Sequence, residues 1–172
     1  MASPLRPSSC KLGRLYPPAT LECGYAKRDC RLRNDGIKSR TMDDDLRDYF
    51  DQQLEWVLRH LSAKFRELLD QVPLYVEDFP SKKMLRKLGV RHRHELQGLY
   101  SGVALTNRSV DLPPSLSEVI YLFREGICNL ALDDEGQIDQ DELREQIRIT
   151  LLHELGHHFG LDERQLDELG YG

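Results

Sequence analysis

The feature that most constrains the fold is a segment near the C-terminal end that carries both a helical repeat and two histidines spaced four residues apart. Apolar residues recur every four positions between residues 140 and 159, which predicts a helix with one buried face that ends at Gly160. These residues are Leu143, Ile147, Leu151 and Leu155. Each residue of a helix turns by about 100°, so His153 and His157 point in nearly the same direction, one turn apart. The pattern therefore places two imidazoles where both can bind one ion.

The residues around the two histidines suggest which ion and which chemistry. Together with Glu154 they form the arrangement HExxH, in which the glutamate projects beside the pair and is better placed to hold a water than to bind the metal. Neutral imidazoles are good zinc ligands, and a catalytic zinc lowers the pKa of its water to about 7. We therefore expect Zn²⁺ as the cofactor and Glu154 as the general base.

A catalytic zinc normally has three protein ligands, and two candidates for the third follow the helix. Glu163 stands six residues beyond His157, the spacing at which the extended motif HExxHxxGxxH has its third ligand. Asp162 is one residue short of that position and is the alternative ligand, or it orients a histidine through a hydrogen bond. The spacing favours Glu163 over Asp162.

A structural interpretation of the same residues competes with the metal site. HExxH occurs by chance in helices that bind nothing, and there the histidines pack near the core while the glutamate is an exposed helix former. The glycine at the helix end and the carboxylate at the third-ligand spacing favour metal binding. His158 points away from the pair, so we expect it to pack or to support the site indirectly.

The other segments predict a mixed α+β domain over residues 42–172. Residues 43–71 carry a helical repeat with acidic residues at the N-terminal end, and Pro73 ends that helix. Further predictions are strands at 74–79, 103–106 and 119–123, a helix from Ser81 to Gly89, and a helical piece at 127–132.

Charge and composition bear on the organisation of the chain and its partners. Residues 1–41 carry nine Lys/Arg and three Asp/Glu without periodicity, so we expect a disordered basic extension, and Met42 is a candidate physiological start. Residues 42–172 carry 15 basic and 26 acidic residues, so nucleic acid is a poor candidate partner. No stretch approaches a membrane span or a secretory signal, so a cytoplasmic location is the default expectation.

Three other groups of residues are weaker candidates for sites. Cys10, Cys23, Cys30 and Cys128 lack the short spacing of metal ligands and are expected to be free thiols. The turn ALDDEGQIDQDE partly resembles a calcium loop, but Ala131 occupies the first ligand position, so it is better explained as the capped start of a helix. His92 and His94 stand among arginines and are interpreted as part of a solvated loop.

Four segments give the chain a resemblance to a known family. They are FRELLDQVPLYVEDFP, ELQGLYSG, LPPSLSEVIYLF and HELGHHFGLDERQLDELG. Over about residues 45–170 the chain resembles the bacterial minimal zincin family. The resemblance implies an α+β zincin-like fold with a small β-sheet packed against the HExxH helix, and a zinc peptidase activity. It also implies that His153 and His157 are ligands, that Glu154 is the base and that Glu163 or Asp162 completes the site.

The chain lacks a feature that larger zincins of the metzincin type have. No methionine follows Met84, so the Met-turn of metzincins is absent, and Tyr100 and Tyr171 are expected to be packing residues rather than oxyanion donors.

The main hypothesis is a metallopeptidase acting on a peptide or protein substrate. The alternatives are a catalytically silent metal-binding or interaction module and, less favoured, a metal-dependent RNA hydrolase with an HxxxHxxGxDH site, whose layout this motif partly shares.

Overall fold

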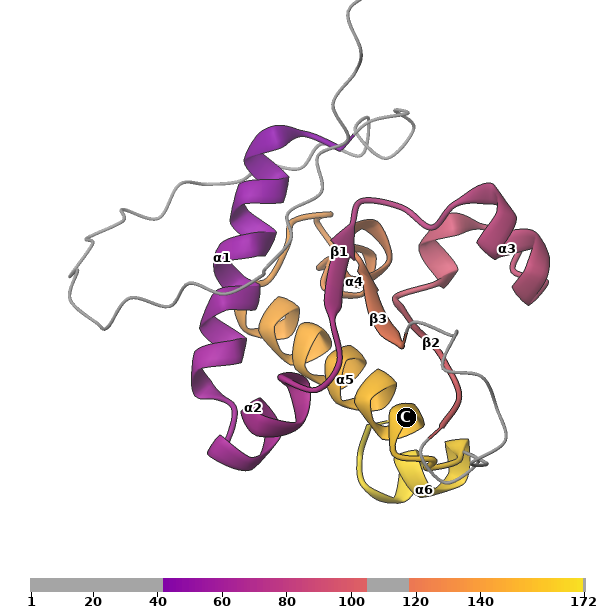
Figure 1. Cartoon of the computed structure of the whole chain (residues 1–172). Coiled ribbons are helices and arrows are strands. Elements are labelled where there is room, and N and C mark those ends of the chain that lie inside the picture. Colours follow the sequence, from indigo (N-terminus) through magenta and orange to yellow (C-terminus); the bar gives the residue numbers. More distant parts are fainter. Residues whose placement is uncertain (1–41, 105–117, 172) are drawn as a thin grey trace, which may run out of the picture.

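Helix α5 (Gln140–His158) is the element against which the rest of the protein packs. The computed structural model describes residues 42–104 and 118–171. Along α5, one face is buried against the sheet and against helices α1 (Asp44–His60) and α4 (Arg124–Leu130). Figure 1 shows α5 passing beneath the sheet with α1 beside it. The four-residue repeat thus predicted this helix and its buried face correctly.

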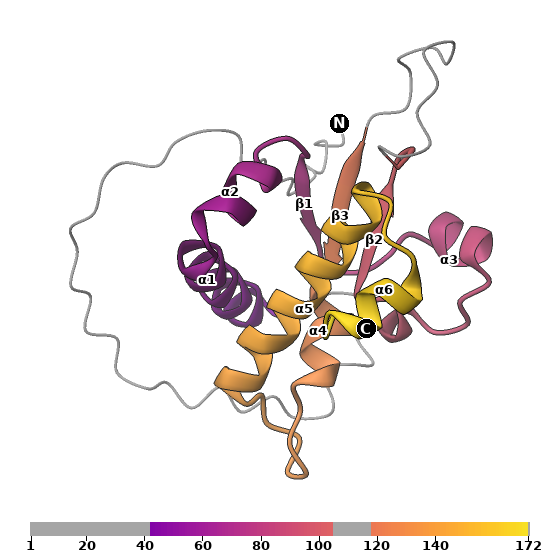
Figure 2. The same ribbon diagram turned by 90° about the horizontal axis from the view of Figure 1, so that it is seen from below.

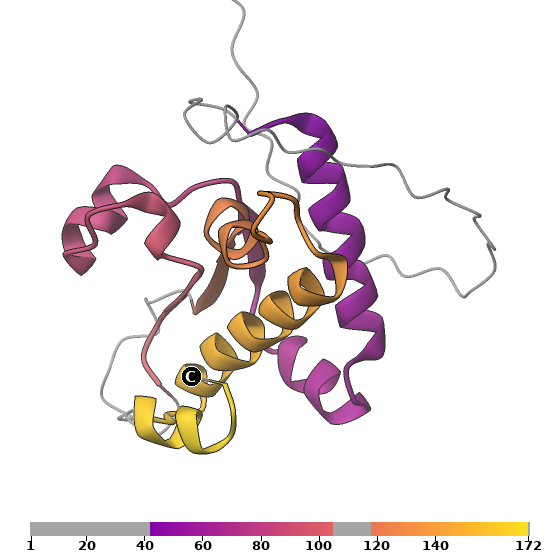
Figure 3. The same ribbon diagram turned by 180° about the vertical axis from the view of Figure 1, so that it is seen from behind.

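A three-stranded sheet covers α5, with its strands in the order β1-β3-β2. The central strand β3 (Val119–Phe123) pairs in parallel with β1 (Leu74–Glu77) and antiparallel with β2 (Gly98–Ser101). Ile120 and Leu122 of β3 are fully buried and belong to the core formed with α5, since alternate residues of a strand share one face. Figure 3 shows the same arrangement from behind. The architecture is α+β, as predicted.

The predicted helix over residues 43–71 is two helices. Helix α1 ends at His60, Leu61 is extended (ψ 148°), and α2 (Ala63–Leu69) begins after Ser62. The Ser62 hydroxyl accepts a hydrogen bond from the Phe65 N–H (3.4 Å) and caps α2. A serine side chain that bonds to the backbone in this way favours a helix start over a helix interior, which is why the apolar repeat alone missed the break.

Helix α3 (Lys82–Leu88) follows its prediction, and the second strand does not. Ser81 caps α3 and Gly89 ends it with a positive φ of 71°. Strand β2 lies at 98–101, whereas the prediction was 103–106; Val103 and Ala104 are outside any strand, and residues 105 and 106 lie outside the described residues. The β-forming residues after Gly102 led the prediction to place the strand five residues too late in the sequence.

In the C-terminal part, the start of α5 agrees with its prediction, and a further helix follows that was not predicted. Asp139 accepts a hydrogen bond from the Glu142 N–H and caps α5, so the acidic turn before it is a capped helix entry, as expected. Helix α6 (Glu163–Glu168) was not predicted. It is short, its sequence is polar, and Leu166 is its one buried residue, so it carries no helical repeat.

The remaining predictions concern termini, thiols and membranes. Cys128 is a free, buried thiol, while Cys10, Cys23, Cys30 and the predicted basic extension lie outside the described residues. None of the described helices is long and apolar enough to cross a membrane.

Candidate metal centre

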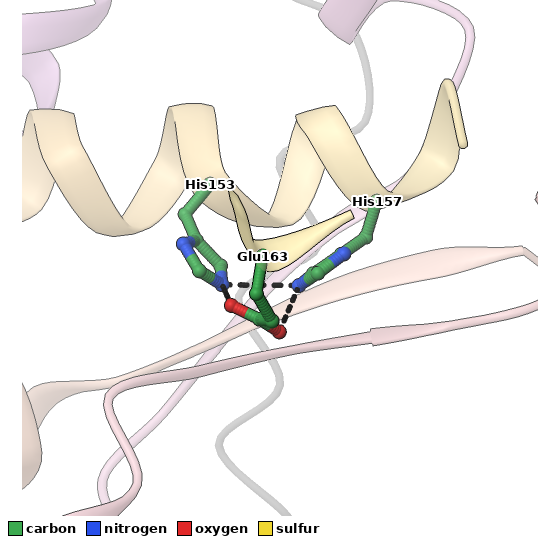
Figure 4. A group of neighbouring side chains, drawn as sticks. All are labelled: His153, His157 and Glu163. Atoms are coloured by element: carbon green, nitrogen blue, oxygen red, sulfur yellow. Dashed lines mark hydrogen bonds and ion pairs between the residues drawn. The ribbon is translucent and has the colours of Figure 1, made fainter. Parts of the chain in front are cut away.

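The two histidines and Glu163 converge at the C-terminal end of α5. One ligand atom from each residue lies within 4.8 Å of the other two, and within residues 42–104 and 118–171 this is the only such group of three or more His, Cys, Asp or Glu. The Nε2 atoms of His153 and His157 are 3.0 Å apart. The Glu163 carboxylate faces both, 3.6 Å from His153 Nε2 and 3.3 Å from His157 Nε2 (Figure 4).

Each histidine is oriented by a backbone carbonyl on the far side of its ring. His153 Nδ1 lies 2.6 Å from the carbonyl oxygen of Tyr171, and His157 Nδ1 lies 3.2 Å from that of Leu161. A carbonyl oxygen only accepts, so Nδ1 of each ring is the donor in these contacts, and an imidazole that binds a metal in this orientation does so through the lone pair of Nε2. This is the second contact that histidine ligands usually make.

The geometry of these donors fits a zinc ion. Two nitrogens bound to one zinc at about 2.0–2.1 Å in tetrahedral geometry lie roughly 3.3 Å apart, close to the separations found here. Two Nε2 lone pairs facing each other at 3.0 Å repel unless a cation or a proton lies between them. Two imidazoles and a carboxylate also match the donors that zinc prefers.

Asp162 and Glu163, the two candidates for the third ligand, have different positions. Glu163 is the first residue of α6, and its side chain is 74% exposed, so its carboxylate is free to adjust towards the histidines. Asp162 is the N-cap of α6 and accepts a hydrogen bond from the Gln165 N–H (2.9 Å). The structure therefore brings Glu163, and not Asp162, to the histidine pair.

Helix α6 reaches this position because of glycines in and after α5. Gly160 has a φ of 83°, which lets the chain turn back after the helix. A Cβ atom on Gly156 would lie 2.4 Å from Cδ2 of Leu166, so the absence of a side chain allows α6 to pack directly on α5. The glycine inside HELGH thus positions the helix that carries Glu163.

Glu154 lies on the neighbouring face of α5 and is almost fully buried (8% exposed). The backbone N–H of Tyr100 in β2 donates to its Oε2 over 2.5 Å. Strand β2 comes close because it has a glycine there: a Cβ atom on Gly98 would lie 2.7 Å from Glu154 Oε1. Burial raises the pKa of Glu154 to about 7, against the opposing effects of the Tyr100 hydrogen bond and of His153. The carboxylate is therefore suited to take and release a proton near neutral pH.

His158 is fully buried beside the site, as expected for a packing residue. Its Nδ1 lies 3.2 Å from the hydroxyl of Tyr100 and 3.6 Å from Oε2 of Glu118. The ring thus links the end of α5 to β2, the strand that contacts Glu154.

The backbone groups that support the site were missed by the sequence analysis. These groups are the carbonyls of Tyr171 and Leu161 and the N–H of Tyr100. Backbone groups of this kind do not depend on the side chain, so the pattern of side chains in the sequence does not predict them. Tyr100 and Tyr171 do pack against the core, as predicted.

Comparison with known sequences gives one family. The profile of the zincin-like metallopeptidase family matches residues 69–172, which is more than half of the chain and includes the sheet, α5 and α6. No curated protein matches the chain significantly. The chain belongs to the zincin-like metallopeptidase family.

Proposed function

We propose that this protein is a zinc-dependent peptidase in which His153, His157 and Glu163 hold the metal and Glu154 acts as the general base. The observation that carries the proposal is the convergence of three ligand atoms within 4.8 Å beside a buried carboxylate on the same helix. Zinc, when bound, would polarise a water and the carbonyl of the scissile bond. The family membership supports hydrolysis of a peptide or protein as the reaction.

Within this proposal each residue has a distinct task. The Nδ1 contacts to Tyr171 and Leu161 hold both imidazoles with Nε2 towards the metal position. Glu154 takes a proton from the attacking water and passes it to the leaving amine, which suits a carboxyl whose pKa burial has raised to about 7. The Tyr100 N–H fixes Oε2 and leaves Oε1 as the oxygen that accepts the proton.

The experiment is peptide hydrolysis by the full chain loaded with zinc, with Glu154→Gln as the matched variant. A peptide library incubated with the wild-type protein and analysed by mass spectrometry should show cleavage. The rate of cleavage should be lower by at least about a hundredfold in the variant. The glutamine side chain keeps the shape and still accepts from the Tyr100 N–H, so zinc content should be unchanged. Zinc binding without cleavage in either protein would instead favour the silent metal-binding module.

A further inference from the structure

A pocket of about 500 Å³ lies away from the metal centre, between the segment around α3 and the start of α4. Its lining combines basic side chains with apolar ones. The basic part includes Lys82, Arg91 and His94, and the apolar part includes Phe79 and Leu85. Figures 1 and 2 show that α3 stands out from the rest of the molecule, and none of its side chains is fully buried.

The charge at this pocket is opposite to that of the rest of the domain. Between Lys82 and His94 the sequence has six Lys/Arg, two histidines and no Asp/Glu, whereas residues 42–172 as a whole have 15 basic and 26 acidic residues. Lys82 and Arg91 are exposed, and the side chain of neither has an ion pair or hydrogen bond among the described residues. Two positive charges at the pocket are therefore available to a ligand.

The carboxylate that lines the pocket does not cancel this charge. Glu125 is buried, and its Oε2 lies 2.7 Å from Nε of Arg93. The same guanidinium lies over the Phe79 ring, 4.0 Å from its centre. Arg93 thus neutralises Glu125 and forms part of the pocket wall, which leaves Lys82 and Arg91 to attract an anion.

The chain connects this pocket directly to the metal centre. His94 lies four residues before Gly98, where β2 begins, and four residues span at most roughly 14 Å. Two residues further along β2, the Tyr100 N–H donates to Glu154. One extended peptide of modest length can therefore reach from the pocket to the proposed catalytic base.

We propose that this pocket binds an acidic segment of the peptide substrate. A carboxylate of the segment pairs with Lys82 and Arg91, and a neighbouring apolar side chain packs against Phe79 and Leu85. The bond to be cleaved lies several residues away, beside Glu154. That the bound segment belongs to a substrate rests on the proposed peptidase function. That the pocket binds an acidic segment does not depend on that function.

A peptide fits this pocket better than a nucleic acid does. The lining offers apolar contacts as well as positive charge, which suits a segment that carries both kinds of side chain. A nucleic acid needs positive charge along its whole backbone, and outside Lys82–His94 the domain carries nine basic and 26 acidic residues.

Binding is tested with a fluorescein-labelled peptide in which glutamate alternates with leucine, read by fluorescence anisotropy. The protein is the full chain with Glu154→Gln, so that no cleavage occurs. Arg91→Glu changes the pocket, and Lys87→Glu makes the same charge change at an exposed α3 residue outside it. We expect Arg91→Glu to weaken binding by about tenfold or more and Lys87→Glu by less than about twofold. The same peptide with glutamine for glutamate should bind at least about tenfold more weakly.

Other outcomes would overturn the proposal. Equal effects of Arg91→Glu and Lys87→Glu would mean that overall charge, and not the pocket, attracts the peptide. Tighter binding of a uridine oligonucleotide would assign the pocket to nucleic acid. Self-association in sedimentation that Arg91→Glu abolishes would assign it to a second copy of this chain.

The peptidase function and the docking of an acidic segment can be refuted independently of each other. A wild-type protein that binds the peptide but cleaves nothing would refute the peptidase and leave the docking of an acidic segment standing. If cleavage occurs, Arg91→Glu should raise KM for the glutamate peptide about tenfold at unchanged kcat, since the pocket acts on binding alone. Cleavage with a KM that Arg91→Glu leaves unchanged would refute the docking site and keep the peptidase.

Discussion

The carbonyl oxygen of Tyr171 lies 2.6 Å from Nδ1 of His153, so the last described residue of the chain orients a proposed zinc ligand in the C-terminal half of α5. This contact joins residues 18 positions apart. It ties the proposed zinc site to the segment that follows α6, in addition to Glu163 at the start of that helix.

Deletion of Tyr171 and Gly172 should therefore weaken zinc binding. The deletion removes the acceptor that fixes the His153 ring, and losses of such contacts typically cost 10- to 100-fold in metal affinity. Zinc affinity measured by competition with a chromophoric chelator checks this. Tyr171→Phe keeps the carbonyl and the ring, so it should bind zinc as the wild type does; a deletion variant with wild-type affinity would show that the contact is irrelevant.

Replacement of Glu163 and of Asp162 should have different consequences. Glu163→Ala removes the proposed third ligand and should lower zinc affinity by at least about a hundredfold, while its effect on the metal-free fold should be small because the side chain is exposed. Asp162→Ala removes the N-cap of α6 and should cost about 1 kcal/mol of unfolding free energy.

The comparison is made by chelator competition and urea unfolding on both variants. Asp162→Asn, which still caps the helix, is the control for the second effect. If Asp162→Ala, and not Glu163→Ala, abolished zinc binding, the assignment of the third ligand would have to be reversed.

The burial of Glu154 predicts a pH dependence of stability in the metal-free protein. Its folded-state pKa is raised from 4.5 to about 7, so folding favours the protonated carboxyl. The resulting stability is fully present below about pH 4.5 and is lost as pH rises through about 7, by up to about 3 kcal/mol. Urea unfolding with EDTA should show the wild type losing stability between pH 5 and 8 relative to Glu154→Gln. Parallel curves for the two proteins would contradict the raised pKa.

Gly156→Ala should disturb the proposed zinc site without touching a ligand. The new Cβ would lie 2.4 Å from Cδ2 of Leu166 and push α6 away from α5. We expect a loss of about 1–3 kcal/mol in unfolding free energy and weaker zinc binding, because α6 carries Glu163. The double variant Gly156→Ala/Leu166→Ala makes room for the methyl group and should recover part of the zinc affinity. No recovery would mean that the clash is not the cause.

The sequence was most informative where a repeat and a chemical motif coincide. The four-residue spacing of Leu143 to Leu155 predicted α5, and the same helical geometry placed His153 and His157 on one face. Strand β3 was likewise predicted from its run of β-branched and aromatic residues.

Local capping and tertiary contacts account for what the sequence did not predict. Ser62 divides the first helix although the apolar repeat runs through it. Helix α6 is too short and polar to show a repeat, so the choice between Asp162 and Glu163 depended on a helix that the pattern did not reveal. The Tyr100 N–H contact to Glu154 joins residues 54 positions apart, and only folding brings them together.

The central claim is tested most directly by the zinc content of the full chain after reconstitution, measured by mass spectrometry of the released metal. The account predicts about one zinc per chain, lost in His153→Ala and in His157→Ala, and retained in His158→Ala if that variant folds. His92→Ala, in an exposed position outside the site, is the control for histidine removal and should keep its zinc. A chain that takes up no zinc, or one whose zinc survives both ligand substitutions, would contradict the site proposed at the end of α5.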